Sequence, residues 1–339
     1  MVMFFLKLFL ALLMFFSTIQ VINPNVEYQN YECKSYILID GYNGDILEGK
    51  NFHDKRSVAS ISKIMTAILA IESEKLFYSF TINSTACNVE GSSIYLKENE
   101  EYRLIDLVYG LLLRSGNDAS YAISEIVEKN TSLFVEKMNQ KAQELQMKNT
   151  YFSNPCGLDI YDDGNISTAY DMAILMKYCM NNELFKEIIS TKEYRFDNHV
   201  YINKNKLLKT YKYLIGGKTG YTSKAKRTLI TAGEKDNQYL IMVSLACSND
   251  YDFHKAIYET YFNRYKYIIF LNKGKNYINQ YIFLTDKIIG MRISINIEKG
   301  IKKYYYNQIT NELTISFIDT NKVEYAGGKY SRILIVNNF

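Results

Sequence analysis

The sequence predicts an α/β (α+β) protein: a mostly antiparallel sheet flanked by helices, with an inserted all-helical lobe and a small β-rich domain at the C-terminal end. Three observations predict this architecture. Strand-like segments come first, helical periodicity fills the middle of the chain, and strand-like segments return near residue 228. Beyond about residue 270 the helical periodicity stops, and alternating segments with Gly and Asn turns follow.

The elements follow in this order. The strand at 35–40 turns at Asn43-Gly44 into a second strand. Apolar residues recur at helical spacing over 58–71, and helices fill 104–145 with a break at Ser115-Gly116-Asn117-Asp118. The remaining elements are a loop (152–165), a helix (168–180), two strands (228–232 and 239–246) and a helix (251–264). We expect a catalytic domain over 25–268 and a small β domain over 269–339.

Composition narrows the class of protein. Of the 339 residues 47% are hydrophobic and 22% are charged, which allows a buried core and excludes a disordered or collagen-like chain. The net charge is +4, and basic residues form no long block. The sequence therefore gives no electrostatic indication of nucleic-acid binding, and we expect no nucleic-acid partner.

The N-terminal segment predicts export. One charge, Lys7, precedes an apolar run from Leu8 to Phe16, which is short for a membrane span but typical of a signal sequence. No clear cleavage site follows, so residues 1–24 are either a cleaved signal peptide or an N-terminal anchor. We expect the rest of the chain to work outside the cytoplasm, secreted or held at the outer face of the cell membrane near the cell wall. Any membrane contact would be made by this segment.

Cysteines and histidines exclude some chemistries. The five cysteines form no CxxC pair, and we expect them to be mostly buried thiols. The three histidines form no HExxH motif, which excludes a zinc peptidase, and we expect no metal and no cofactor. No GxSxG motif is present, which disfavours a Ser-His-Asp hydrolase.

Three short motifs carry the chemistry. They are Ser60-Ile61-Ser62-Lys63, Ser115-Gly116-Asn117 and Lys218-Thr219-Gly220. Each alone is weak, and a second SxxK sequence, Ser223 to Lys226, opens no amphipathic helix. All three in order, each in a suitable structural setting, make a strong joint signal.

The residue types suit acyl transfer. Ser60 begins a helix, where backbone N–H groups stabilise negative charge, and Lys63 lies one turn later on the same face. Lys63 can accept the proton of Ser60 only if it is neutral, which requires burial and a second cation to lower its pKa. Lys218 is the expected second cation.

The other two motifs supply proton transfer and substrate contacts. Ser115 can relay a proton to a leaving amine, and Asn117 can hold a substrate backbone. Gly220 permits close approach of an acyl group, whose carbonyl oxygen would lie near the N–H groups of Ser60 and Tyr221.

These motifs resemble the penicillin-recognising serine enzymes, and within them the serine-type D-alanyl-D-alanine carboxypeptidases. The resemblance covers about 35–266 and includes ASISKIMTAILAI, LLLRSGNDAS, FSNPCGLD, ISTAYDMAILMKY and IGGKTGYTSKAKRTLITAG. It implies a β-lactamase/transpeptidase-like fold and removal of the terminal D-alanine from peptidoglycan stem peptides, with β-lactams as covalent inhibitors. The later β domain is similar to the family's C-terminal domain in architecture only.

The resemblance also implies residue roles. Ser60 would be the acylated nucleophile, Lys63 its general base and Ser115 a proton shuttle. The implied substrate-binding residues are Asn117, Lys218, Thr219, Gly220 and Tyr221, with Thr219 on the terminal carboxylate and Tyr221 as the second oxyanion N–H.

Two departures from the family leave alternatives open. Many members carry an arginine shortly after the second of the late strands, where this chain reads SNDYDFHKA; His254, Lys255 or Lys224 are the candidate substitutes. The chain ends in a strand-like SRILIVNNF instead of an amphipathic helix. A β-lactamase on the same scaffold is disfavoured because no ExxxN sequence lies between Asp118 and Gly217. A catalytically idle wall-binding module is a second alternative, and a transpeptidase or endopeptidase with the same site residues also stays open.

Overall fold

The computed structural model describes residues 31–159, 164–279, 281–297, 299–310, 312–330 and 334–337. The expected signal or anchor at 1–24 lies outside these residues. Within them, no helix is both long enough and apolar enough to cross a membrane.

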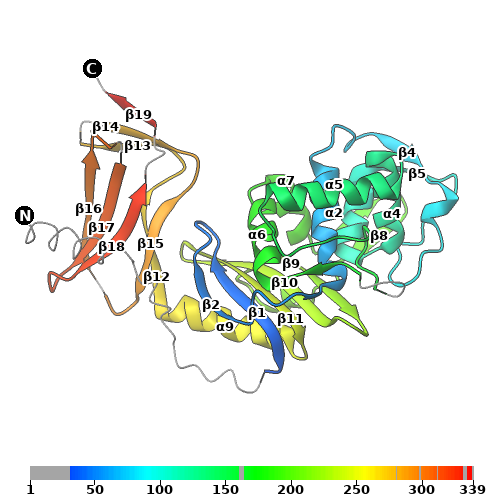
Figure 1. The fold of residues 1–339 in the computed structure, drawn as a ribbon, viewed down its shortest axis with the longest axis horizontal. Coiled ribbons are helices and arrows are strands. Elements are labelled where there is room, and N and C mark those ends of the chain that lie inside the picture. Colours follow the sequence, from blue (N-terminus) through cyan, green and yellow to red (C-terminus); the bar gives the residue numbers. More distant parts are fainter. Residues whose placement is uncertain are drawn as a thin grey trace, which may run out of the picture.

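A five-stranded antiparallel sheet forms the centre of the fold, with strand order β2-β1-β11-β10-β9 (Figure 1). Its strands are β1 (Cys33–Asp40), β2 (Ile46–Lys50), β9 (Leu214–Thr222), β10 (Lys226–Lys235) and β11 (Gln238–Cys247). The first strand of the chain pairs with β11, with Ile37 opposite Val243. Both strand pairs predicted from the sequence are present, and the mixed helix and antiparallel-sheet fold is confirmed.

Helices cover both faces of this sheet (Figure 1). Along β11, Ile241 and Val243 pack with α2 (Lys63–Ile71) and α6 (Ala169–Cys179) on one face. Leu240 and Met242 alternate with them and pack against α9 (Asp250–Arg264) on the other face. Because both faces are covered, the interior of β10 and β11 is an almost continuous apolar run.

The helical lobe is inserted between β2 and β9. Its helices are η1 (Ala59–Ser62), α2, η2 (Ser84–Ala86), α3 (Leu104–Tyr109), the π-helical turn η3 (Gly110–Arg114), α4 (Asn117–Glu128), α5 (Thr131–Glu144), α6, α7 (Glu183–Ser190) and α8 (Leu207–Thr210). Short strands join them: β3 (Arg56–Ser57), β4 (Ser79–Thr81), β5 (Glu101–Arg103), β6 (Ile166–Ser167), β7 (Glu193–Phe196) and β8 (His199–Ile202). The helix expected over 58–71 begins instead as a 3₁₀ turn.

Beyond α9 the chain is all β. Its strands are β12 (Tyr265–Leu271), β13 (Gly274–Ile278), β14 (Tyr281–Thr285), β15 (Ile289–Ser294), β16 (Gly300–Asn307), β17 (Glu312–Asp319), β18 (Glu324–Tyr330) and β19 (Leu334–Asn337). They enclose a separate apolar cluster that includes Leu271, Phe283 and Ile315. Arg292 of β15 connects this part to the central sheet, because its guanidinium donates to Asp40 over 2.7 Å and to Gln238 over 2.6 Å.

A disulfide corrects the expectation for the cysteines. Cys33 and Cys247 lie directly opposite each other on β1 and β11 and form a disulfide across 214 residues of sequence. Cys87, Cys156 and Cys179 are free thiols, and the last two are buried. The pairing could not be found from spacing, because it depends on the first strand of the chain becoming the neighbour of β11, which is more than 200 residues away in sequence.

Candidate active site

Ser60, the nucleophile expected from the sequence, lies on a strained turn that packs against β9. Ala59, immediately before Ser60, has a φ of 48°, in the left-handed region that residues with a Cβ rarely adopt. A Cβ added to Gly220 would lie 2.9 Å from the backbone N of Ser60 and 3.1 Å from that of Ile61. The third motif therefore needs glycine at this position, as the sequence predicts, because the β9 backbone packs directly against the turn that carries Ser60.

Lys63 is fully buried and points at the nucleophile. Its ammonium nitrogen lies 2.9 Å from Ser60 Oγ, 2.7 Å from Asn117 Oδ1 and 2.5 Å from the carbonyl oxygen of Cys156. Three acceptors thus fix the nitrogen, and one of them is the hydroxyl that must lose a proton.

Burial and neighbouring positive charges lower the pKa of both motif lysines. Burial lowers the pKa of Lys63 to about 8, and the positive charge of Lys204 lowers it further. Burial also lowers the pKa of Lys218 well below its ordinary value, and repulsion from Lys63 adds to this. A buried lysine beside other cations can hold a neutral amine near neutral pH, which is the state a general base requires.

Ser115 faces the third motif. The π-helical turn η3 ends at Ser115, whose φ of 64° turns the chain sharply before α4 begins. Its hydroxyl accepts a hydrogen bond of 2.9 Å from Lys218 Nζ, which also donates to the Thr219 carbonyl. The structure therefore brings Ser115 and Lys218 together across 103 residues of sequence.

The side chain of Asn117 has partners within the protein, in addition to the substrate contact that we expect from the sequence. Its Oδ1 accepts from Lys63, and its Nδ2 donates to the Glu90 carbonyl over 2.5 Å. Its backbone N–H donates to the Ser92 carbonyl. The side chain is 4% exposed, so in this structure its amide holds Lys63 in position.

The third motif lines the open side of this arrangement. Along β9, Lys218 is buried, Thr219 and Gly220 are half-buried, and Tyr221 is 64% exposed. Thr219 pairs with Leu229 and Tyr221 with Arg227 of β10, so β9 is the edge strand of the sheet. The second SxxK sequence begins in the turn between β9 and β10, and its Lys226 is the first residue of β10. It therefore opens no helix, as we expected from the sequence.

The loop that contains Cys156 also positions Lys63, a role that we did not expect from the sequence. In the segment 153–159, Asn154 Oδ1 accepts from the backbone N–H groups of Cys156 and Gly157, and Asn154 Nδ2 donates to Leu158 O. This fold of the loop directs the Cys156 carbonyl at Lys63. Sequence reasoning missed this contact, since a backbone carbonyl is present in every residue type.

His254 is excluded as the substitute for the missing arginine. It is completely buried between α9 and the sheet, where its ring nitrogens contact Thr231 Oγ1 and Ser244 Oγ. Burial lowers its pKa to about 3, so it stays neutral. On the same strand, the hydroxyl of Thr228 donates a hydrogen bond to the Val58 carbonyl, close to the turn that carries Ser60. Thr228 and Thr231 thus point to opposite faces of the sheet, and His254 lies on the face away from this turn.

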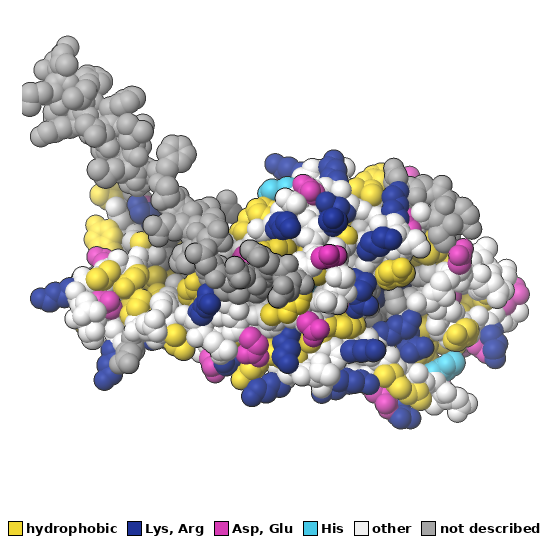
Figure 2. All heavy atoms as spheres, turned by 90° about the horizontal axis from the view of Figure 1, so that it is seen from below, with side chains coloured by type: hydrophobic (Ala, Val, Ile, Leu, Met, Phe, Trp, Pro, Cys, Tyr) yellow, Lys and Arg dark blue, Asp and Glu magenta, His cyan; other side chains and the backbone are white. Residues whose placement is uncertain are grey.

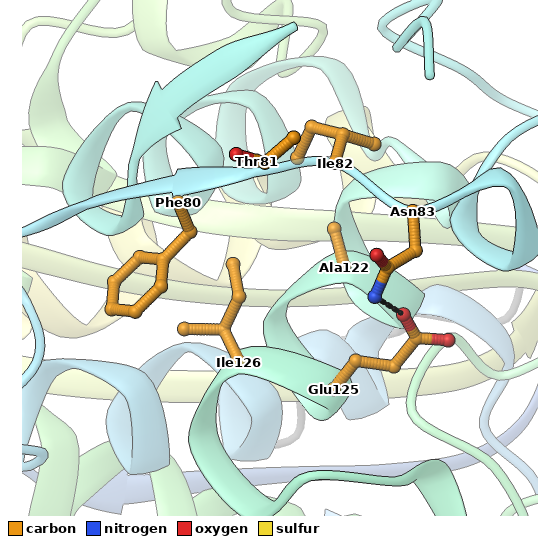
Figure 3. A pocket seen from close by; sticks show the side chains of 7 residues that line it. All are labelled: Phe80, Thr81, Ile82, Asn83, Ala122, Glu125 and Ile126. Atoms are coloured by element: carbon orange, nitrogen blue, oxygen red, sulfur yellow. Dashed lines mark hydrogen bonds between the residues drawn. The ribbon is translucent and has the colours of Figure 1, made fainter. Parts of the chain in front are cut away.

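A cavity of about 200 Å³ lies elsewhere in the helical lobe, between β4 and α4. Figure 3 shows the side chains that line it. Phe80 and Ile126 line its apolar side, and Asn83 donates to Glu125 at its polar side. None of the motif residues lines it. This cavity is therefore separate from the residues that the three motifs bring together.

Comparison with known proteins identifies the family. A family described as D-alanyl-D-alanine carboxypeptidase matches residues 22–249, about two thirds of the chain. The chain belongs to this family. The D-alanyl-D-alanine carboxypeptidase DacF of Bacillus subtilis is 37% identical over 228 residues, which are 64% of this chain and 58% of that protein. The match thus spans less than two thirds of this relative's length.

Solved structures of similar proteins share the fold of this family member. Penicillin binding protein 6B from Escherichia coli is 26% identical with a TM-score of 0.71, covering 87% of this chain and 94% of that chain. Penicillin binding protein 5 from Haemophilus influenzae has a TM-score of 0.76 at 24% identity, covering 91% and 97%. The latter likeness extends through the C-terminal strands and concerns the fold alone.

Proposed function

We propose that this member of the D-alanyl-D-alanine carboxypeptidase family is an active serine enzyme that removes the terminal D-alanine from peptidoglycan stem peptides. One observation carries the proposal: the buried amine of Lys63, with its lowered pKa, is 2.9 Å from Ser60 Oγ. An idle module would not need to keep two lysines buried at a cost in stability.

The mechanism follows from the positions of the side chains. Lys63 takes the proton of Ser60, whose oxygen attacks the carbonyl carbon of the penultimate residue. The developing oxyanion is stabilised by the N–H groups of Ser60 and Tyr221. Ser115, hydrogen-bonded to Lys218, gives its proton to the departing amine and is reprotonated with the proton that Lys63 took from Ser60. The neutral Lys63 then takes a proton from water as the water oxygen attacks the acyl carbon, and it returns this proton to Ser60 Oγ as the acyl–oxygen bond breaks.

The proposal extends to location and organisation. The name of penicillin binding protein 6B supports penicillin binding by this protein as well. We propose further that β-lactams inhibit the enzyme covalently and that it acts in cell-wall and cell-shape maintenance. The Cys33–Cys247 disulfide supports work outside the cytoplasm, because such bonds persist in oxidising compartments. We retain residues 25–268 as the catalytic domain and 269–339 as a β domain, although β12 already begins at Tyr265.

Intact-protein mass spectrometry after brief exposure to benzylpenicillin tests this function. We expect one adduct on the protein that persists for many minutes, and none on the Ser60→Ala variant. An adduct that vanishes while the drug is consumed would indicate a β-lactamase on the same scaffold. No adduct on the unaltered protein would make the idle module the better description.

A further inference from the structure

The loop 153–159 packs directly on the turn that carries Ser60. Gly157 has a φ of 86°, and a Cβ added to it would lie 2.1 Å from the Ala59 carbonyl oxygen and 2.7 Å from Ser62 Oγ. Only glycine allows two backbones to approach this closely. The loop therefore has a fixed position relative to the turn.

Asp159 lies at the end of this loop and joins two distant strands. Its Oδ2 accepts a hydrogen bond of 2.9 Å from Ser57 Oγ and one of 2.6 Å from Thr222 Oγ1. Ser57 ends β3, three residues before Ser60. Thr222 ends β9 and directly follows Tyr221. One carboxylate oxygen thus links the two segments that carry the expected oxyanion N–H groups.

The link also includes the turn from β9 to β10. Thr222 Oγ1 accepts from the backbone N–H of Ala225 over 2.9 Å, so its own proton is directed at Asp159. Hydrogen bonds from hydroxyls to a carboxylate are shorter and stronger than those between neutral groups. The end of β9 is therefore held both to its own turn and to the loop 153–159.

A second link lies on the other side of Tyr221. Because β9 is at the edge of the sheet, it has β10 on one side only. On β10, Thr228 lies opposite Gly220, and its hydroxyl donates to the Val58 carbonyl over 3.0 Å. This bond holds the nucleophile turn to the sheet one residue before Tyr221, and Asp159 holds it one residue after.

We infer that Asp159 is a positioning residue for the oxyanion site. Through Ser57 and Thr222 it sets the separation of the two N–H groups that stabilise the oxyanion. The inference rests on the proposed function, since that function supplies the oxyanion. Such donors are effective only when both lie about 2.7–3.1 Å from the oxyanion, and a misplacement of about 1 Å can cost about a hundredfold in rate.

The dependence of the acylation rate on benzylpenicillin concentration tests this role, because it separates the maximal rate from the half-saturating concentration. Asp159→Ala should lower the maximal rate about tenfold to a hundredfold and change the half-saturating concentration less than twofold. A loss confined to the maximal rate indicates weaker stabilisation of the transition state. A misfolded fraction would instead reduce the final amount of adduct.

Variants of Thr222 test whether Asp159 acts through this hydroxyl. Thr222→Val keeps a β-branched side chain but removes the hydroxyl, and it should slow acylation in the same way as Asp159→Ala. Thr222→Ser keeps the hydroxyl and should acylate at nearly the unaltered rate. The double variant Asp159→Ala/Thr222→Val should be within about twofold of Asp159→Ala, because both changes remove the same link.

Asp171→Ala is the matched control. The Asp171 carboxylate also accepts from a hydroxyl, Thr150 Oγ1, over 2.8 Å, and from the backbone N–H of Asn149. It joins α6 to this segment, and neither of them carries an expected oxyanion donor. The control should therefore lower the Tm and leave the maximal acylation rate unchanged.

Three results would overturn the inference. They are an unchanged maximal rate in Asp159→Ala, an equal loss of rate in Asp171→Ala, and a half-saturating concentration that rises as much as the rate falls. The last would mean that Asp159 shapes the binding cleft instead of the oxyanion site. Failure of the proposed function would appear in the unaltered protein: no benzylpenicillin adduct there would refute the enzyme activity and the inference together.

Discussion

At the scale of single residues, the position of Lys63 determines how the site can work. Its nitrogen has three oxygen acceptors and is completely enclosed, so the charged form gains hydrogen bonds but loses hydration. Burial outweighs these bonds, since the pKa falls to about 8. Near neutral pH a fraction of the molecules therefore holds the neutral amine that accepts the proton of Ser60.

The acylation rate should depend on pH accordingly. Only the neutral amine acts as base, so the rate of Ser60 acylation should rise about tenfold per pH unit below 8 and level off above it. The acylation rate is measured by mass spectrometry of the benzylpenicillin adduct in samples quenched at timed intervals, between pH 6 and 9.5. A rate that is constant over this range would contradict Lys63 as the base.

Substitution of Lys63 gives an independent test. Lys63→Ala should slow acylation by ~10³-fold or more, because a positioned base contributes that much to catalysis. Lys177→Ala is the control, since Lys177 is a half-buried lysine with a lowered pKa on α6, and it should acylate normally. An unchanged rate in Lys63→Ala would make another group the base.

At the scale of elements, the loop 153–159 acts as a support for the base. Asn154 closes the loop on itself, and Asn165 Oδ1 accepts from the N–H groups of Ser153 and Asn154. The Asn165 carbonyl accepts from the N–H of Val58, which precedes the nucleophile turn. Buried amides thus connect the loop that holds Lys63 to the turn that holds Ser60.

Two asparagine variants distinguish an effect on the position of Lys63 from an effect on the stability of the fold alone. Asn154→Ala and Asn139→Ala each remove partly buried hydrogen bonds to this stretch of chain, and each should cost about 1–3 kcal/mol of unfolding free energy. Only Asn154→Ala should also slow acylation and shift its pH profile, because only Asn154 orients the Cys156 carbonyl. Thermal denaturation and acylation rates measure the two effects. Equal effects on acylation would assign Asn154 a purely structural role.

The elements also show what the sequence could predict. Local patterns located β1, β10, β11, α6 and α9, because alternation and helical spacing are properties of neighbouring residues. The three motifs were found for the same reason. Helix α7 and the β7–β8 hairpin were not predicted, because they are short and give only a weak local pattern. The contribution of Lys204 was missed because its proximity to Lys63 arises from the packing of distant segments.

At the scale of the whole molecule, a few buried links join the parts of the fold. On the face shown in Figure 2, basic and acidic side chains lie among apolar ones, with no band of one sign. Inside, Arg292 and Asp40 form an ion pair whose side chains are 9% and 2% exposed. Their burial makes this pair a defined junction between the central sheet and the strands that follow α9.

Breaking the Arg292–Asp40 ion pair should lower the free energy of unfolding of the protein. Arg292→Met leaves Asp40 buried without its cation and should cost about 3–5 kcal/mol, as for other buried pairs that lose one partner. Calorimetry should show a lower Tm, and separate transitions if the parts on either side of the junction unfold independently. Lys275→Met, an exposed change on β13, is the control and should leave the Tm within error.

The disulfide should contribute stability in proportion to the loop it closes. A link across 214 residues restricts the unfolded chain strongly, by up to about 5 kcal/mol in the chain-entropy model. The Cys33→Ala/Cys247→Ala protein should therefore unfold at lower denaturant concentration, whereas Cys87→Ala should not. An unchanged midpoint in the double variant would show that strand pairing alone holds β1 to β11.

The pairing of β1 with β11 also has a consequence for biosynthesis. The ribosome makes β1 among the first residues of the described chain, whereas its partner β11 is completed only at Cys247. Until then β1 has only the short β2 beside it, and its other edge is open to pairing with foreign strands. Nascent chains that stop before residue 238 should thus require a chaperone, while those that extend past β11 can close the sheet by themselves.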